Sequence, residues 1–326
     1  MSLNEWLILF LSFNLIIFGG SQRLFKMSGV ANWKSIIPIY NIVKHLDIIK
    51  RPRWWAILVF IPVINLLMIP VIWIEFIKMF NHNSKLDRIL VVITLGFYIY
   101  FVSYFSNRTK YLGEISFSNF EKSVGSFVFA IVIATIVHNY ILQPFVIPTG
   151  SLEKTLRVGD FLLVSKFHYG ARIPSTVLTL PMVHDTIPFI KTRSYLKKPQ
   201  LPYMRIPGFQ EIKNNDIVVF NWPADTVRKF FVKEKGVIKP RDKKSNYVKR
   251  AIGIPGDSLE IKDGIIYVNG EINLLPDRAK PLFNYKIKSK KGISSNKLSQ
   301  LNIDGFIRKF IIKNLSQASF SEIYEY

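Results

Sequence analysis

The stretch FVIPTGSLEKTLRVGDFLLVSKFHYGARIP, residues 145–174, begins where a long apolar run of the sequence ends. Its tripeptide Thr149-Gly150-Ser151 places a hydroxyl about two helical turns beyond that run, at the surface of a bilayer that the run would enter. After Gly159 the pattern changes to short β-rich runs such as DFLLVSKF. The stretch therefore marks a boundary between a membrane region and a mainly β region, and it raises the question of which base could activate Ser151.

The composition of the 326-residue chain favours membrane segments, because 49% of its residues are hydrophobic and 14% are aromatic. There are no cysteines, which excludes disulfides and thiolate zinc sites. The formal charge is +22, but the cations are spread among apolar runs and are not gathered into one arm. We therefore expect the basic surface to face anionic membrane lipids, at about 1 kcal/mol per well-placed cation, and not nucleic acid.

Four apolar segments precede residue 148, each near the length of roughly 17 to 25 residues that spans hydrocarbon. They are residues 6–20, 54–73, 89–105 and 126–145. Seven lysine and arginine residues lie between the first two segments, so the positive-inside rule places that loop in the cytoplasm. The sequence thus predicts a multi-domain, multi-pass protein of the cytoplasmic membrane. Residues 1–147 form its transmembrane helical region, and everything after Phe145 is extracytoplasmic.

Residues 148–326 are predicted to form a mainly β domain. The runs NDIVVFNW, YVKRAIGI and SLEIKDGIIYVNGE are separated by turns. In the last run, Asp263-Gly264 lies between two alternating segments, and this dipeptide favours a tight β-hairpin. Past Lys280 the pattern weakens, and the sequence reaches Tyr326 without a convincing end to the fold. We therefore expect this domain to be incomplete at its C-terminus.

Three kinds of partner could activate Ser151. The histidines His168 and His184 lie in the same region, but neither belongs to a motif that places it beside a serine. Lys154 gives the S-x-x-K spacing of penicillin-binding enzymes. That motif needs both residues on one helical turn and a companion K-T-G, whereas this segment reads as a turn followed by a strand and no K-T-G exists. The third candidate is Lys249, in the run YVKRAIGIPGD.

Three ordered motifs that contain Ser151 and Lys249 make the chain resemble type I signal peptidases, the membrane-bound serine proteases that remove signal peptides. In that family a membrane anchor is followed by I-P-S-G-S-M-x-P-T-L-x-x-G-D, then K-x-x-Y-G-x-R, then Y-x-K-R-x-x-G-x-P-G-D. The matching runs here are IPTGSLEKTLRVGD (147–160), KFHYGAR (166–172) and YVKRAIGIPGD (247–257). Their order, spacing and position behind an apolar run agree over residues 126–275.

This resemblance implies that Ser151 is the catalytic nucleophile and Lys249 the general base. A lysine accepts a proton only when it is neutral, and an apolar site favours the neutral amine. The oxyanion would be met by the Ser151 backbone N–H and by the hydroxyl of Thr149, where the family has serine; one such donor is worth roughly 3 kcal/mol. The resemblance also implies substrate-binding residues for the small side chains at positions −1 and −3 of a signal peptide, namely Phe145, Ile147, Pro148, Leu152, Tyr247 and Val248.

The implied activity is an endopeptidase of the outer face of the cytoplasmic membrane. It would remove the signal peptides of exported preproteins through an acyl-enzyme, without a metal or another cofactor. Its implied partners are those signal peptides, anionic lipids and the secretion translocon.

Several positions depart from the family pattern. Leu152 replaces a methionine and Lys154 a proline. A further family motif, G-D-N-x-x-x-S-x-D-S-R, supplies a serine and an aspartate that help to hold the lysine, and it does not occur before Tyr326. This leaves open a shortened chain, or a non-catalytic homologue that binds exported chains without cleaving them. A multispan transporter has little support, because the apolar segments contain no acidic cluster beyond Glu75.

Overall fold

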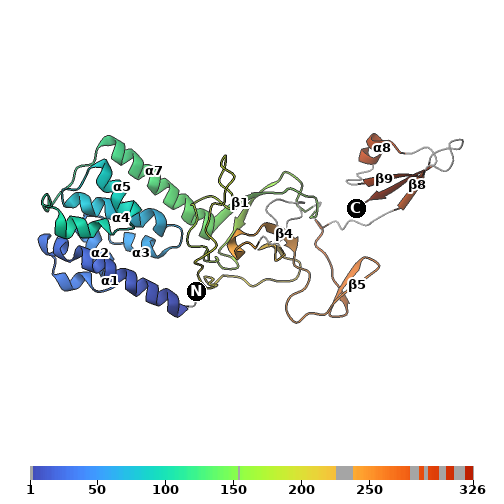
Figure 1. Ribbon diagram of the computed structural model, residues 1–326. Helices are drawn as coiled ribbons and strands as arrows, with labels where there is room; N and C mark the ends of the chain where they lie inside the picture. Colours follow the sequence, from blue (N-terminus) through green and yellow to red (C-terminus); the bar gives the residue numbers. More distant parts are fainter. Residues whose placement is uncertain are drawn as a thin grey trace. The chain divides into compact units, whose positions relative to one another are not determined.

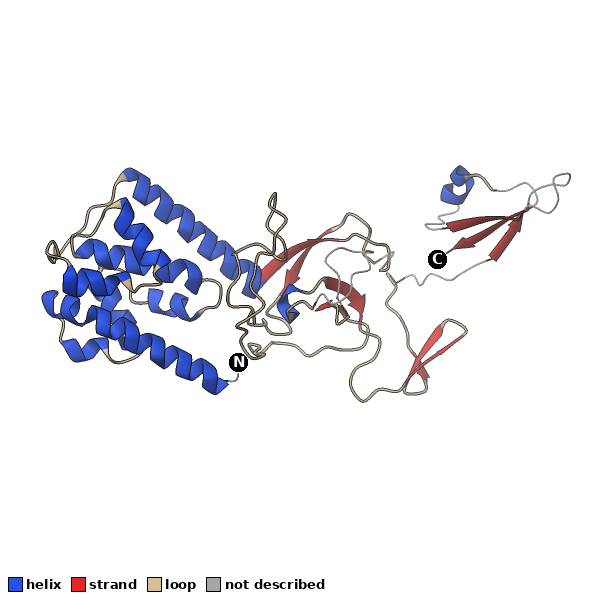
Figure 2. Cartoon of the chain, viewed as in Figure 1, coloured by secondary structure: helices blue, strands red, loops and turns tan. Residues whose placement is uncertain are grey.

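The computed structural model describes residues 3–152, 155–224, 238–279, 286–289, 293–300, 306–311 and 320–325. The chain forms two compact units. The first consists of Met1–Pro144, Leu163–Glu211 and Phe220–Tyr247, and the second of Phe145–Leu162, Ile212–Val219 and Val248–Tyr326. Helices dominate up to Ile141, six residues before the end of the helical region that the sequence predicts at residue 147, and strands begin at Leu142 (Figures 1 and 2).

The helical part of the first unit contains several helices of very different length. They are α1 (Leu3–Met27), α2 (Tyr40–Ile48), α3 (Trp55–Phe60), α4 (Asn65–Met79), α5 (Lys85–Ile93), α6 (Tyr98–Tyr100) and α7 (Asn119–Ile136). A 3₁₀ turn, η1 (Asn32–Ser35), precedes α2, and the π-helical turns η2 (Phe101–Phe105) and η3 (Val137–Ile141) extend α6 and α7. Helices α5 and α7 each begin with a capping box, in which a serine and an acidic side chain satisfy orphan N–H groups.

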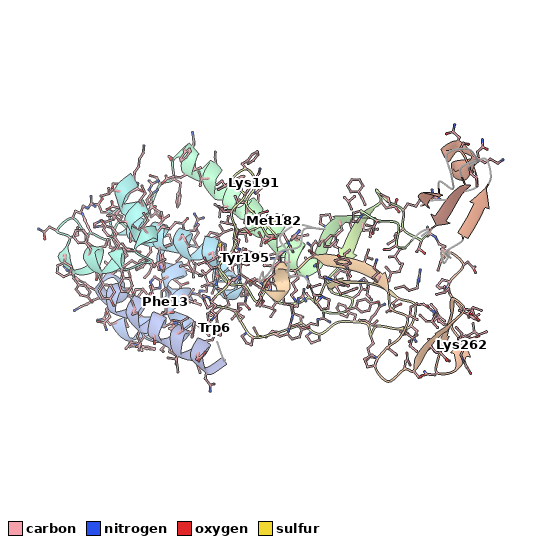
Figure 3. All side chains as sticks on the ribbon, turned by 45° about the vertical axis from the view of Figure 1, so that its right-hand side comes forward. Trp6, Phe13, Met182, Lys191, Tyr195 and Lys262 are labelled. Carbon is pink, nitrogen blue, oxygen red and sulfur yellow. The ribbon has the colours of Figure 1, made fainter. Side chains whose placement is uncertain are left out.

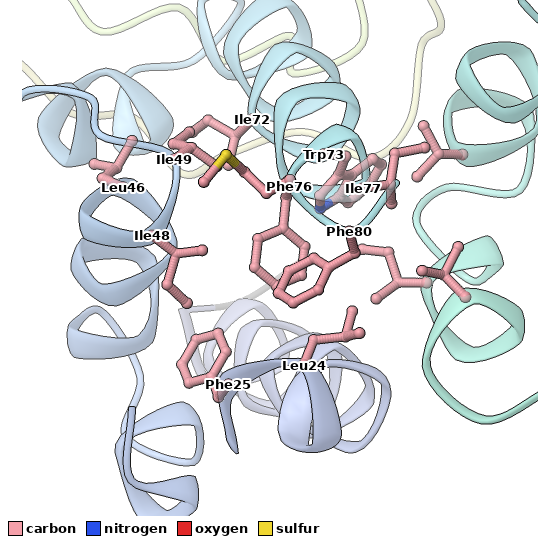
Figure 4. Close-up of a cluster of buried hydrophobic side chains, with 14 of the residues drawn as sticks. Leu24, Phe25, Leu46, Ile48, Ile49, Ile72, Trp73, Phe76, Ile77 and Phe80 are labelled. Carbon is pink, nitrogen blue, oxygen red and sulfur yellow. The ribbon is translucent and has the colours of Figure 1, made fainter. Parts of the chain in front are cut away.

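Aromatic and aliphatic side chains from α1, α2 and α4 form the core of this helical part (Figure 4). Phe76 of α4 lies at its centre, and its ring centroid is 6.2 Å from that of Phe25 and 5.2 Å from that of Phe80. All three rings are fully buried and pack edge to face, the arrangement that aromatic quadrupoles favour. A smaller cluster contains Val132 of α7 and Met68 of α4, so that α7 packs against the same bundle.

One helix of the described residues is long and apolar enough to cross a membrane, the 23-residue segment Asn119–Ile141 that α7 and η3 form together. A second segment qualifies only if the two parts of α1, Asn4–Ile17 and Gly19–Met27, count as one span, and they are bent by 44°. These two segments overlap the fourth and first predicted spans, but residues 142–145, the end of the predicted fourth span, belong to strand β1.

The other two predicted spans are not continuous helices. Residues 54–73 are divided between α3 and α4 by the turn at residues 61–64, where Pro62 lies. Residues 89–105 are divided by a turn after α5, and Gly96 within that turn has a φ of 88°, a conformation that ends a helix. The predicted four-span arrangement is therefore supported only in part.

The strands form small sheets. Strand β1 (Leu142–Val146) pairs with β2 (Phe161–Ser165), and β3 (Ile217–Asn221) with β4 (Asn246–Arg250). A three-stranded antiparallel sheet contains β5 (Leu259–Lys262), β6 (Ile265–Val268) and β7 (Glu271–Ile272). Another has the order β8 (Lys286–Ser289), β10 (Phe320–Glu325), β9 (Phe306–Ile311). A short helix, α8 (Ser295–Gln300), lies between β8 and β9 in the sequence.

The predicted hairpin at Asp263-Gly264 is confirmed. Lys262 of β5 pairs with Ile265 of β6, so the two turn residues alone connect the strands. Their φ angles of 47° and 79° are both positive, as the favoured two-residue hairpin turn requires. The two turn residues therefore determine the register of this hairpin, and for this reason the hairpin could be predicted from the sequence.

The segment between β2 and β3 forms one long excursion that runs outward and back. Isolated antiparallel bridges connect its two arms. Arg172 pairs with Arg205, Thr176 with Gln200, Thr179 with Tyr195, and Thr186 with Arg193. At its base the backbone passes very close to itself, because a Cβ added at Gly170 would lie 2.1 Å from the carbonyl oxygen of Ile206. Gly170 also has a φ of 86°, so the glycine of the KFHYGAR motif is required here by both space and conformation.

Candidate active site

Ser151 lies on the loop between β1 and β2, in the second unit. The base of this loop is closed by backbone hydrogen bonds, because the N–H of Ile147 donates to the carbonyl of Asp160 at 3.0 Å and the N–H of Gly159 donates to the carbonyl of Ile147 at 2.9 Å. The Asp160 carboxylate accepts from the N–H of Arg157 at 2.8 Å. Gly159 has a φ of 93°. The Gly-Asp pair of the first motif therefore closes the loop that carries the serine.

Lys249 lies on β4, 98 positions after Ser151 in the sequence, and its Nζ donates a hydrogen bond to the Ser151 Oγ. Ser151 is exposed and Lys249 is half-buried, so a substrate can reach the hydroxyl. The structure thus brings together the two residues that the motifs predict as nucleophile and base. Lys154, the rival base three positions after Ser151, lies outside the described residues.

Neither histidine candidate is joined to Ser151. His168 follows β2 and shares a hydrogen bond with the Ser165 hydroxyl, and its ring stacks on that of Phe167 at 4.6 Å. His184 lies on the excursion after β2, and burial lowers its pKa, to which the nearby charge of Lys243 adds. Both histidines belong to the first unit, whereas Ser151 belongs to the second.

The predicted substrate-binding residues differ in their exposure. Phe145, Leu152 and Val248 are half-buried, Pro148 is exposed, and Ile147 is only 3% exposed. All five belong to the unit that contains Ser151. The Tyr247 ring belongs to the first unit and stacks on the Trp222 ring, with centroids 4.8 Å apart. Thr149, the predicted oxyanion donor, is exposed on the serine loop.

Arg250, the neighbour of Lys249, connects the lysine strand to the serine loop. Its Nη1 donates to the carbonyl of Asn215 at 2.7 Å, and its Nη2 donates to the Thr155 Oγ1 at 3.1 Å. The Thr155 hydroxyl in turn donates to the carbonyl of Arg278 at 3.0 Å. The partners of Arg250 are thus a carbonyl and a hydroxyl. Thr155 and Asn215 were not predicted as site residues.

Asp257 organises the turn that follows the lysine strand. Its carboxylate accepts from the N–H of Ile254 at 2.9 Å and from the amides of Asn214 and Asn269, each at 2.9 Å. These hydrogen bonds lower the pKa of Asp257, with the backbone donor first. The Asn214 amide also donates to the carbonyl of Ile252 at 3.1 Å. The Gly-Asp pair of the third motif therefore has a structural role, as the first one does.

Lys166, the first residue of the KFHYGAR motif, is held in an environment that disfavours its charge. Burial lowers its pKa to about 8, and the neighbouring Arg172 adds to this lowering. Its Nζ forms no hydrogen bond or ion pair with a described residue. Because the pKa in the folded protein lies below that of an exposed lysine, the unfolded chain binds more protons, and stability rises with pH between about 8 and 10.5.

We expect Lys166→Met to raise the unfolding temperature of the purified chain at pH 7. The expected gain in the free energy of unfolding is about 3 kcal/mol at most, which is the burial penalty that the lowered pKa of Lys166 implies. This gain should shrink as the pH rises from about 8 towards 10.5. Thermal unfolding of the full chain in detergent at pH 7 and pH 10 measures it. Lys191→Met, at an exposed position, is the control, and a lower unfolding temperature for Lys166→Met would contradict the expectation.

Comparison with known families divides the chain into two recognised parts. Residues 121–302, more than half of the chain, match the family described as "Signal peptidase, peptidase S26". This match includes Ser151, Lys249 and the three motifs. Residues 33–114 match a "Family of unknown function (DUF5684)", which covers most of the helical bundle.

Curated proteins similar to this chain are named signal peptidase I. The protein of Rickettsia massiliae (strain Mtu5) is 32% identical over 145 residues, which is 44% of this chain and 41% of the relative. That of Pseudomonas aeruginosa (strain PAO1) is 30% identical over 148 residues, which is 45% of this chain and 37% of the relative. The chain thus spans about two fifths of the length of these relatives. No solved structure matches it.

Proposed function

We propose, because this chain belongs to the peptidase S26 family of signal peptidases, that it is a serine endopeptidase that removes signal peptides from exported preproteins. The observation that carries this proposal is the hydrogen bond between Lys249 Nζ and Ser151 Oγ. A serine hydroxyl is a weak nucleophile until a neighbouring base takes its proton. Lys249 is the base in reach, and the exposed Ser151 gives a peptide access to the hydroxyl.

The chemical steps follow from these two residues. Neutral Lys249 accepts the Ser151 proton while the Oγ attacks the carbonyl carbon of the last residue of the signal peptide. The oxyanion is stabilised by the Ser151 N–H and the Thr149 hydroxyl, each worth about 3 kcal/mol when well placed. The lysine ammonium then donates its proton to the leaving amine as the peptide bond breaks. Water, deprotonated by the neutral lysine, hydrolyses the acyl-enzyme and releases the signal peptide.

We propose that cleavage takes place at a membrane surface. The helix Asn119–Ile141 is the candidate anchor, and Ser151 follows Ile141 by ten residues. A signal peptide is itself an apolar helix, so its cleavage site would emerge at the surface where this anchor ends. We further propose the cytoplasmic membrane, an extracytoplasmic Ser151, several passes that include α1, and the secretion translocon as a partner. The residues proposed to receive the small −1 and −3 side chains are Phe145, Ile147, Pro148, Leu152, Tyr247 and Val248.

The activity can be tested with the full chain in detergent and a preprotein that carries a signal peptide. We expect a single cut, and mass spectrometry of the products should place small residues at positions −1 and −3 before the new N-terminus. A chain that binds the preprotein and leaves it intact would contradict the proposal and would favour the non-cleaving homologue.

Thr155 offers a test of how the site is held together, because its hydroxyl accepts from the guanidinium beside Lys249. A hydrogen bond to a charged group is worth about 1.5–3 kcal/mol, so Thr155→Val should lower kcat by about tenfold and leave KM little changed. Thr155→Ser keeps the hydroxyl and should cleave nearly as fast as the wild type. Equal rates for the valine and serine variants would show that the contact does not position the lysine.

A further inference from the structure

The first unit contains a large pocket that the proposed cleavage chemistry does not use. It lies between the base of the excursion after β2 and residues 238–244, and its volume is about 1060 Å³. Among the described residues, six cationic residues line it together with one carboxylate, Asp242. The cations are Arg172, Lys197, Lys198, Lys239, Arg241 and Lys244. We call it the cationic pocket.

The carboxylate in the cationic pocket is already engaged by neutral groups. Asp242 accepts from the Ser175 hydroxyl at 2.8 Å, from the Thr176 hydroxyl at 2.8 Å and from the Thr176 N–H at 3.1 Å. These three hydrogen bonds tie residues 175–176 to the segment that contains Asp242. Asp242 therefore holds the pocket walls together, and a single carboxylate cannot balance the cations around it.

Within the part of the chain that the structure describes, most of these cations have neutral partners or none. Arg172 donates to the side-chain carbonyl of Asn221, Lys244 donates to the carbonyl of Pro223, and Arg241 stacks on the Tyr203 ring at 4.8 Å. Lys197 and Lys198 are exposed and form no ion pair with a described residue. Burial is the main cause that lowers the pKa of Arg172. Tyr203 and Asp242 oppose this lowering, and the positive charges of Arg205 and Arg241 add to it. Lys239 differs, since it lies 3.2 Å from Asp185. The pocket thus holds uncompensated positive charge that an anionic ligand would neutralise.

The remaining lining indicates what kind of anion fits. Leu201, Ile238, Pro199 and Pro240 contribute apolar surface between the cations. A bare phosphate would contact the cations and leave this surface and most of the volume unused. A ligand that joins a phosphate to an apolar body would use both.

A hydrogen bond connects the pocket to an apolar helix of the same unit. Trp6, near the start of α1, donates its indole N–H to the carbonyl of the pocket residue Gln200 at 3.0 Å (Figure 3). Beyond Trp6, α1 presents apolar side chains to the outside, and Ile8 is 64% and Leu15 61% exposed. Tryptophan is enriched where apolar helices meet the headgroup layer. The pocket therefore lies at the end of a helix surface that suits lipid.

We propose that the cationic pocket binds the phosphodiester headgroup of an anionic phospholipid. This inference rests on the proposed membrane attachment of the chain, and it is independent of the Ser151 chemistry. Arg172, Lys197 and Arg241 contact the phosphate, while Leu201 and Ile238 contact the glycerol and the upper acyl chains. Such a site would hold the excursion after β2 against the headgroup layer.

The test counts lipids on the full chain in neutral detergent by native mass spectrometry, during titration with dioctanoyl phosphatidylglycerol. Wild type is expected to bind one lipid tightly, and phosphatidylcholine much more weakly. The double variant Lys197→Gln with Arg241→Gln removes one cation from each of the two segments that line the pocket, and its affinity for the lipid should fall about 25-fold, at about fivefold per cation. Lys197→Arg with Arg241→Lys keeps the charge and should bind nearly as well as wild type.

The matched control is Lys191→Gln with Arg193→Gln, which removes two exposed cations of the same unit that do not line the pocket. An equal loss of affinity in the control and pocket variants would overturn the proposal, because general attraction would then explain the binding. Inorganic phosphate that binds as tightly as the lipid, or polyglutamate that displaces it, would also overturn it. Ser151→Ala should bind the lipid like wild type, so a failure of cleavage and a failure of lipid binding remain distinguishable.

Discussion

Ser151→Ala is expected to abolish preprotein cleavage, with a fall in kcat of at least about 10⁴-fold. The Ser151 Oγ is the atom that forms the acyl bond in the proposed mechanism. Without it the acyl-enzyme cannot form. Removal of a serine nucleophile in other serine proteases causes losses of this order or greater. The measurement is the rate of product formation from a purified preprotein in detergent, with mass spectrometry to detect an acyl-enzyme in the wild type.

Ser258→Ala is the matched control for this variant, because Ser258 is exposed and belongs to the same unit. It should cleave at the wild-type rate. The Ser151→Ala chain should still bind the preprotein and unfold at an unchanged temperature, since an exposed hydroxyl contributes little to stability. Cleavage by Ser151→Ala at more than a trace rate would exclude this serine as the nucleophile.

Lys249→Met should cause a loss of similar order, because methionine keeps much of the side-chain length and removes the amine that accepts the proton. Lys249→Arg is the sharper variant. A guanidinium can still donate a hydrogen bond to the Ser151 Oγ, but it does not lose its proton in proteins and so cannot act as a base. Both variants should therefore be inactive if Lys249 is the base. If its role were only to donate a hydrogen bond, the arginine variant would remain active.

The control for Lys249 is Lys262→Met on β5, an exposed lysine that lies 2.9 Å from Glu260. Its cleavage rate should be unchanged, since an exposed ion pair contributes at most about 1 kcal/mol to stability. The pH profile of the wild type gives a second measurement. The rate should fall towards acid pH, because only the neutral amine accepts a proton. A rate that stays constant on the acid side would contradict the assignment of Lys249.

The sequence predicted the Ser151 and Lys249 pair because each lies in a motif with a fixed pattern of glycine, proline and aspartate. Those residues set the loop and turn that present the two side chains, as Gly159 and Asp257 illustrate. The hairpin at Asp263-Gly264 was predictable for a similar reason, since its two positive φ angles depend on the turn residues themselves. Where local chemistry determines the backbone, the sequence was sufficient.

The breaks in the apolar segments were harder to predict. Pro62 lies in the turn between α3 and α4, whereas Pro70 lies within α4. Hydropathy averaged over a window treats both prolines alike and joins the two helices into one span. Which proline ends a helix depends on tertiary packing, because neighbouring groups can satisfy the carbonyl that loses its donor. The predicted span over residues 54–73 failed as a continuous helix for this reason, whereas the span over residues 89–105 is broken at the turn that contains Gly96.

The supporting contacts of the site and the cationic pocket also escaped prediction. Arg250 is 95 positions from Thr155 and 35 from Asn215, and Arg172 is 69 positions from Arg241 in the pocket wall. No periodicity or spacing in a single sequence reports such pairs. They arise only when the strands and the excursion after β2 are in place.

Glu121 joins the two parts of the chain that are recognised as separate families. It is the first residue of the S26 match, and its carboxylate lies 2.8 Å from Lys78 and 2.9 Å from Arg88, both in the DUF5684 match. The Lys78 side chain is only 5% exposed, so it has no ready access to water as a substitute partner. Residues 1–120 are thus coupled to the S26 part of the chain through these two ion pairs. A peptidase excised from residue 121 onwards would lose the bundle that anchors the start of α7, and a bundle expressed alone would retain a buried ammonium without its counter-ion.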